Sequence, residues 1–138
     1  VRQLSQTEIY CGQVKLLRSV PGIGVLTAMT ILTELESINR FRNIDNMCGY
    51  IGLIPSTKSS GEKERTGDIT PRGHTVLRTA IIESSWTAIR NDPSLMRSYL
   101  SYTKRMDSNK AIIKIAKKLL SRIRFVLTNN KPYICSMV

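Results

Sequence analysis

Residues 108–128 read SNKAIIKIAKKLLSRIRFVLT, and this stretch decides the fold class of the chain. Its apolar residues recur at the three- and four-residue spacing of one helix face, which predicts a long helix with one side buried. That face consists of Ala111, Ile112, Ile115, Ala116, Leu119, Ile123 and Val126. The other side carries Lys110, Lys114, Lys117, Lys118 and Arg122.

The basic side of this helix has two interpretations, a solvated surface or a stripe that follows the phosphates of a nucleic acid. From Ser108 to the end of the chain there are seven basic residues and no acidic one. Because no glutamate stands four residues away to neutralise a lysine on the same helix, the phosphate-binding interpretation is favoured.

The rest of the chain also shows helical patterning, so the sequence predicts an all-α fold. We expect a single domain over residues 1–138, in which a helix-hairpin-helix is followed by a small helical bundle. The expected helices cover about residues 4–20, 26–36, 43–50, 70–91 and 93–105. Asn43 or Asp45 is the expected N-cap of the third, and Thr70 that of the fourth, with Pro71 as its first helical residue.

The Pro21-Gly22-Ile23-Gly24 turn resembles a helix-hairpin-helix motif, here over about residues 14–36. Proline ends the first helix, and the two glycines adopt backbone conformations that are costly for other residues. The second helix then begins with exposed N–H groups that can hold a phosphate oxygen, so Gly22 and Gly24 are candidate nucleic-acid contacts. Such hairpins also serve purely as packing elements, and both interpretations stay open.

Residues 56–69 form the one long connection, of about 14 residues, and a loop of that length in a small domain is either functional or mobile. A small β-hairpin could form within it around Thr66-Gly67. The wider segment, about 50–73, contains a serine pair, Ser59-Ser60, followed by Gly61. Lys58 and Lys63 add positive charge and are further candidate nucleic-acid contacts.

The charge distribution is strongly asymmetric. The chain has 21 basic and 10 acidic residues, a net charge of +11, and most of this excess lies in the basic helical part at about 70–130. A segregated positive field favours a polyanionic partner, most often nucleic acid; a solubility charge or an acidic protein partner is the alternative.

Other function classes receive no support. No apolar run approaches the ~20 residues of a membrane helix, and the first residues lack the apolar core of a signal peptide. Three widely spaced cysteines indicate neither a disulfide framework nor a zinc site, which fits a reducing cytoplasm. No metal site is expected in this chain. It begins without methionine, from which we expect a piece of a longer protein.

Taken in order, several motifs resemble the C-terminal transposase domain of the IS110/IS116 insertion-sequence family, which includes the Piv-type DNA invertases. They are Pro21-Gly22-Ile23-Gly24, Gly52-Leu53-x-Pro55, Ser60-Gly61, Ile69-Thr70-x-x-Gly73, Leu77-Arg78 and the closing Ala116-Lys117-Lys118-Leu119-Leu120 block, and the similarity covers about residues 14–133. The resemblance implies a two-part bacterial enzyme for DNA transposition and recombination, cytoplasmic and associated with the nucleoid. Its N-terminal RuvC-like domain, absent from this sequence, would bind Mg²⁺. The resemblance further implies DNA as partner, a guide non-coding RNA in some members, and a homo-oligomer for the full-length protein.

In this family a serine of the C-terminal domain attacks DNA, and the motif places it on Ser60, with Ser59 as the neighbouring alternative. A serine hydroxyl is a weak nucleophile without a base or electrostatic help, and Arg65, Arg72 and Arg78 are candidate donors to the phosphoryl oxygens. Ordinary turn chemistry is the alternative explanation of Ser-Gly. His74, the only histidine, is either a general base or a surface residue.

The chain departs from the family pattern at Pro71 and His74, where lysine and asparagine are usual, so activity of this copy is an open question. Alone it is expected to be inactive. Two further hypotheses are a non-catalytic nucleic-acid-binding module and a structural or oligomerisation domain with an incidental basic surface.

Overall fold

The structure, a computed structural model, describes residues 10–35, 37–53 and 72–134, without the side chains of 72–74. Within these ranges the chain is all-helical and contains no strand, which confirms the predicted fold class. The expected loop and β-hairpin at 56–69 lie outside the described residues. No described helix is long and apolar enough to cross a membrane.

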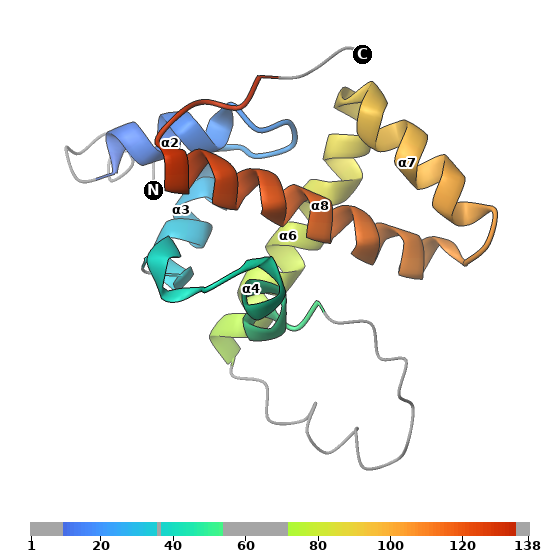
Figure 1. Cartoon of the computed structure of the whole chain (residues 1–138), viewed down its shortest axis with the longest axis horizontal. Coiled ribbons are helices and arrows are strands. Elements are labelled where there is room, and N and C mark those ends of the chain that lie inside the picture. Colours follow the sequence, from blue (N-terminus) through green and yellow to red (C-terminus); the bar gives the residue numbers. More distant parts are fainter. Residues whose placement is uncertain (1–9, 36, 54–71, 135–138) are drawn as a thin grey trace.

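Helix α8, Ser108–Asn129, is the central element, and it runs across the molecule in front of the others (Figure 1). It contacts α2 (Cys11–Arg18), α4 (Ile44–Ile51), α6 (Arg72–Asn91), α7 (Pro93–Thr103) and the short 3₁₀ helix η1 (Ile38–Arg40). All seven apolar residues of the predicted face are buried, and Leu120 joins them. The amphipathic pattern therefore identified both the helix and its buried side.

Helix α6 crosses behind α8 and forms the second half of the core (Figure 1). Leu77 and Ile81 are fully buried on it, and α3, Val25–Leu35, packs against the same helix. The predicted end of α6 at Asn91 is confirmed. Its predicted N-cap, Thr70, and Pro71 lie outside the described residues.

Two shorter helices begin at a side-chain cap, and one of these caps was predicted. Asn43 is the N-cap of α4, because its side chain accepts a hydrogen bond from the Asn46 backbone N–H at 2.9 Å. The N-cap of α7 is Asp92, whose Oδ1 accepts from the Ser94 backbone N–H at 2.9 Å. Each cap satisfies a backbone donor that the helix itself leaves unpaired.

The chain after α8 turns back onto the first helical pair. Asn130 adopts a left-handed conformation (φ 56°) that ends α8, and the backbone N–H of Tyr133 donates to Ser19 Oγ at 2.7 Å. The segment after α8 is thereby fastened beside the end of α2.

Candidate nucleic-acid interface

The basic surface predicted on α8 is present over part of the helix. Lys110, Lys114 and Lys118 are exposed, and none of them makes an ion pair with a described residue. Their positions follow from the helix period, since four-residue steps keep side chains on one face while the apolar residues point into the core. The surface can therefore present uncompensated positive charge to a polyanion.

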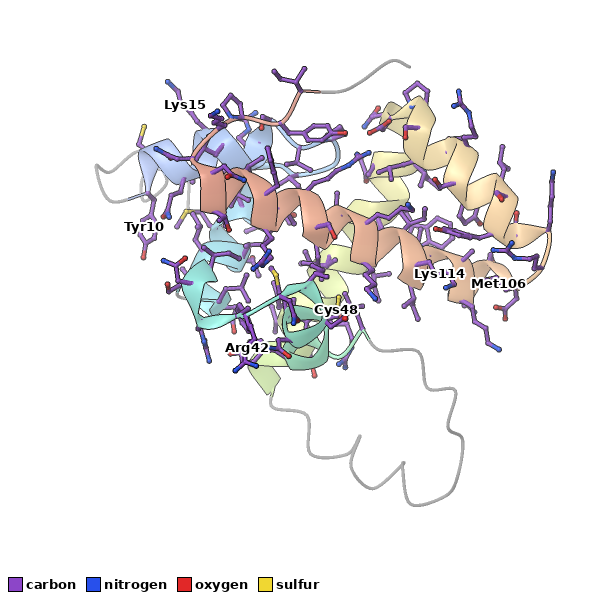
Figure 2. The ribbon with its side chains drawn as sticks, viewed as in Figure 1. Tyr10, Lys15, Arg42, Cys48, Met106 and Lys114 are labelled. Carbon is purple, nitrogen blue, oxygen red and sulfur yellow. The ribbon has the colours of Figure 1, made fainter. Side chains whose placement is uncertain are left out.

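The surface is hollowed where α7 meets α8. A shallow depression of about 270 Å³ is lined by Tyr102 from α7 and by Lys114, Lys117, Lys118 and Ser121 from α8. Figure 2 shows Lys114 on the part of α8 that runs beside α7. The Lys114 Nζ lies 5.7 Å from the centroid of the Tyr102 ring, and the Arg105 guanidinium carbon lies 6.0 Å from it. Tyr102 carries no charge and belongs to no motif, so the sequence did not predict it as a site residue.

Lys117 is compensated from another helix. Its Nζ lies 3.0 Å from Asp45 Oδ1 of α4, and both side chains are at least half exposed. The hydrogen bond to Asp45, followed by the attraction of its charge, raises the pKa of Lys117 above the ordinary lysine value. Sequence spacing identifies acidic partners only on the same helix, so it could not predict the pairing of Lys117 with Asp45. The pair holds the lysine near α4 and lowers the local charge, although exposed pairs add little stability.

Arg122, the last predicted member of the phosphate-binding stripe, is paired with a carboxylate from another helix. Its Nη1 donates to Asp92 Oδ2 at 2.5 Å, its side chain is only 15% exposed, and that of Asp92 is fully buried. The guanidinium carbon also lies 4.6 Å from the Tyr133 ring centroid. A buried carboxylate needs a paired cation, so the positive charge of Arg122 is neutralised by Asp92 inside the protein.

The Pro21–Gly24 turn is used at least partly for packing. Gly22 has φ +94°, and a Cβ added to it would lie 2.6 Å from the Ser84 carbonyl oxygen and 2.9 Å from the Ala88 Cβ of α6. Gly22 thus lets the turn approach α6. Gly24, in contrast, is exposed, and a Cβ added there would meet no heavy atom within 4 Å beyond its chain neighbours. The Gly24 carbonyl accepts from the Ala28 N–H at the start of α3. Nucleic-acid contact by either glycine stays a prediction.

The serine loop itself lies outside the described residues: Ser59, Ser60, Lys58, Lys63 and Arg65 all fall there. Arg72 begins α6 and His74 lies in its first turn, but their side chains are not described.

What the structure does describe is the point from which the loop leaves α4. Gly52 ends α4 in a left-handed conformation with φ +92°, and its backbone N–H donates to the Cys48 carbonyl. Arg78 of α6 reaches the same place, where its Nη1 donates to the Ile51 carbonyl at 3.3 Å. A Cβ on Gly52 would lie 2.5 Å from that Nη1. Arg78 therefore joins α6 to the end of α4, which places it at the base of the loop.

The described residues contain no group of three or more His, Cys, Asp or Glu side chains that could hold a metal ion. Carboxylates are the ligands that Mg²⁺ prefers.

The sequence model of the family described as "Transposase IS116/IS110/IS902 family" matches residues 14–101. The IS1111A insertion-sequence transposase of Coxiella burnetii is 30% identical over 123 residues, covering 86% of this chain and 34% of that protein. The 43.6 kDa protein of insertion element IS110 from Streptomyces coelicolor is 29% identical over 119 residues, covering 85% of this chain and 29% of that protein. The chain thus spans about a third of these relatives. No solved structure is significantly similar to it.

Proposed function

Since this chain belongs to the IS116/IS110/IS902 family of transposases, we propose that it forms the DNA-binding, serine-bearing part of a longer insertion-sequence transposase. The observation that carries the binding half of this proposal is the α8 surface, where Lys110, Lys114 and Lys118 are exposed and unpaired with any described carboxylate. Lysines in such an arrangement bind phosphates and release counterions from the nucleic acid.

The chemical half of the proposal assigns phosphoryl transfer to Ser60. The Ser60 hydroxyl oxygen attacks a DNA phosphorus, an O–P bond forms, and the bond from phosphorus to the sugar oxygen breaks. The serine proton leaves to a base, and the sugar oxygen departs as an alcohol after protonation. In-line attack of this kind depends on positioning and on donors to the phosphoryl oxygens.

The contacts at the end of α4, just before the loop in sequence, support this assignment. Arg78 joins the end of α4 to α6, and Gly52 supplies the backbone conformation that the exit requires. We assign Arg78 to positioning of the loop, while Arg65 and Arg72 remain the proposed donors to the phosphate. Magnesium is proposed to bind in the part of the transposase that lies outside this chain, where it would stabilise the charge that develops on the phosphate.

The experiment compares Ser60→Ala with Ser59→Ala in a transposase that has the length of the relatives and contains this chain. The protein is incubated with Mg²⁺ and end-labelled DNA, denatured, and tested for DNA attached covalently to protein. We expect an adduct in Ser59→Ala and none in Ser60→Ala, with unchanged DNA binding in both. An adduct in Ser60→Ala that disappears in Ser59→Ala would move the nucleophile by one residue. An adduct that persists in both variants would reject the serine mechanism.

A non-catalytic nucleic-acid-binding module is the second candidate. It is favoured by one observation, namely that the exposed lysines without a described acidic partner, Lys110, Lys114 and Lys118, lie on α8 and not in the serine loop. This candidate predicts binding that depends on Lys114 and Lys118 and no covalent adduct under any condition. The same adduct assay, repeated with and without candidate guide RNA, separates the two functions and tests the proposed RNA partner. Sedimentation of the longer protein tests the proposed homo-oligomer.

A further inference from the structure

We propose that the depression between α7 and α8 binds one nucleotide of a single-stranded nucleic acid, with its base stacked on Tyr102 and its phosphates held by Lys114 and Lys118. This inference rests on the proposed nucleic-acid binding and adds a specific subsite to it. The depression measures about 270 Å³ and is lined by an aromatic ring, three lysines and the Ser121 hydroxyl.

The ring is suited to act as a platform. Tyr102 is half-buried and packs against the hydrophobic core, so its orientation is fixed before any ligand arrives. A fixed ring loses little conformational freedom on binding, and this favours stacking. Base stacking on aromatic side chains tolerates any base, because every base has a π-face.

The charges around the ring are suited to phosphate. Lys114 and Arg105 place their cationic groups 5.7 and 6.0 Å from the ring centroid, and Lys118 is exposed on the rim. Of the nearby acids, Asp45 pairs with Lys117, and Asp107 caps α8 by accepting from the Lys110 N–H at 3.1 Å, so the cations around the ring outnumber the acids that face them. Positive charge at the depression is therefore left for a ligand.

The combination of ring and lysines decides between single strand and duplex. Lysines alone would suit the backbone of either form. A duplex keeps the faces of its bases inside the stack, so it offers no planar surface to a tyrosine, whereas an unpaired strand offers both base and phosphate. The geometry thus points to a strand that is unpaired, at least locally. DNA and RNA share this chemistry and differ at the 2′-hydroxyl.

The test measures binding of the 138-residue chain to fluorescent oligothymidylate, oligouridylate and a DNA duplex by anisotropy, over a range of salt concentrations. Tyr102→Leu is expected to weaken single-strand binding about tenfold, which corresponds to loss of one stacked base, and to leave the salt dependence and duplex binding unchanged. Tyr102→Phe retains the ring and is expected to bind like the wild type.

The lysine arm has a matched control. The Lys114→Gln, Lys118→Gln double variant is expected to reduce the slope of log K against log salt by about 1.4 for a single strand, because each phosphate contact contributes about 0.7. Lys15→Gln removes a lysine charge from α2, far along the molecule from Lys114 (Figure 2), and is expected to leave the slope unchanged.

The outcomes separate this inference from the function on which it rests. If all three nucleic acids bind and Tyr102→Leu behaves like wild type, the stacking subsite is rejected while nucleic-acid binding stands. A slope change of about 0.7 in Lys15→Gln, half that expected for the double variant, would show that binding responds to net charge alone, which also rejects the subsite. Absence of binding to every probe at low salt would overturn both proposals. Preference for oligouridylate or for oligothymidylate assigns the strand to RNA or DNA.

Discussion

Replacing Gly22 with serine is expected to destabilise the fold, whereas the same change at Gly24, two residues later, is not. A side chain at Gly22 must adopt φ near +94°, and its Cβ would meet the Ser84 carbonyl oxygen at 2.6 Å. The left-handed conformation costs about 1–2 kcal/mol and overpacking about 1–3 kcal/mol, so the free energy of unfolding should fall by roughly 2–5 kcal/mol. The clash is with helix backbone and cannot be relieved by a rotamer change.

For Gly24→Ser we expect only a small change in the free energy of unfolding, in the opposite direction. Its Cβ position is open, and the residue precedes the first residue of α3, where serine is a good N-cap. Gly24→Ser should therefore be neutral or stabilise the fold by a few tenths of a kcal/mol.

Urea unfolding followed by circular dichroism measures both variants. With a slope of about 2 kcal/mol/M, the Gly22→Ser midpoint should drop by about 1–2.5 M, and the Gly24→Ser midpoint should hardly move. Equal midpoints for the two variants would refute the packing of Gly22 against α6. A Gly22→Ser protein that keeps its stability but loses DNA binding would instead assign the turn to phosphate contact.

Three other perturbations test the described contacts. Arg122→Met should lower the free energy of unfolding by about 3–5 kcal/mol in urea titration because it leaves a buried carboxylate unpaired, whereas Lys118→Met should change it by less than about 0.5 kcal/mol. Arg78→Met should lower the free energy of unfolding by about 1–2 kcal/mol in the same titration, because the Ile51 carbonyl at the end of α4 loses its hydrogen-bond donor. An unchanged midpoint would show that this hydrogen bond does not stabilise the fold. Burial raises the pKa of the Cys48 thiol above its ordinary 9.0, so the stability that Cys48 contributes is present below about pH 9 and is lost as pH rises through the higher folded-state pKa. In that pH window the wild type should lose stability relative to Cys48→Ala. Peptide mapping after thiol labelling at pH 7 should find Cys11, which is exposed, modified before Cys48, which is buried.

Local sequence signals predicted the helices well because the physics behind them is local. The caps at Asn43 and Asp92 act within two or three residues, and the glycine at position 52 ends α4 through its own backbone conformation. The stripe over residues 108–128 repeats for about six turns, so its period is unambiguous. The first helix was expected over residues 4–20, but α2 covers only Cys11–Arg18, with Tyr10 as its N-cap, and residues 1–9 lie outside the described residues.

The interface was harder to predict because it depends on pairs that are distant in sequence. Arg122 looks like the next member of a lysine stripe until Asp92, on a different helix, is known to lie beside it. Lys117 looks unpaired until α4 brings Asp45 to it. Helical spacing reports neighbours on one helix only, and with so few acids in the basic half, each tertiary pairing changes the assignment of a cation.

These pairings also explain how a chain with a net charge of +11 can keep both a stable core and a binding surface. Asp92 draws Arg122 inward, where the pair joins the α7 start to α8, and Asp45 holds Lys117 toward α4. Of the α8 lysines without a described acidic partner, Lys114 and Lys118 lie where an aromatic side chain of α7 reaches the depression. Acidic residues are too scarce to neutralise every cation, so their placement selects which lysines stay available. The proposed binding surface is therefore defined as much by the few carboxylates of the domain as by its many basic residues.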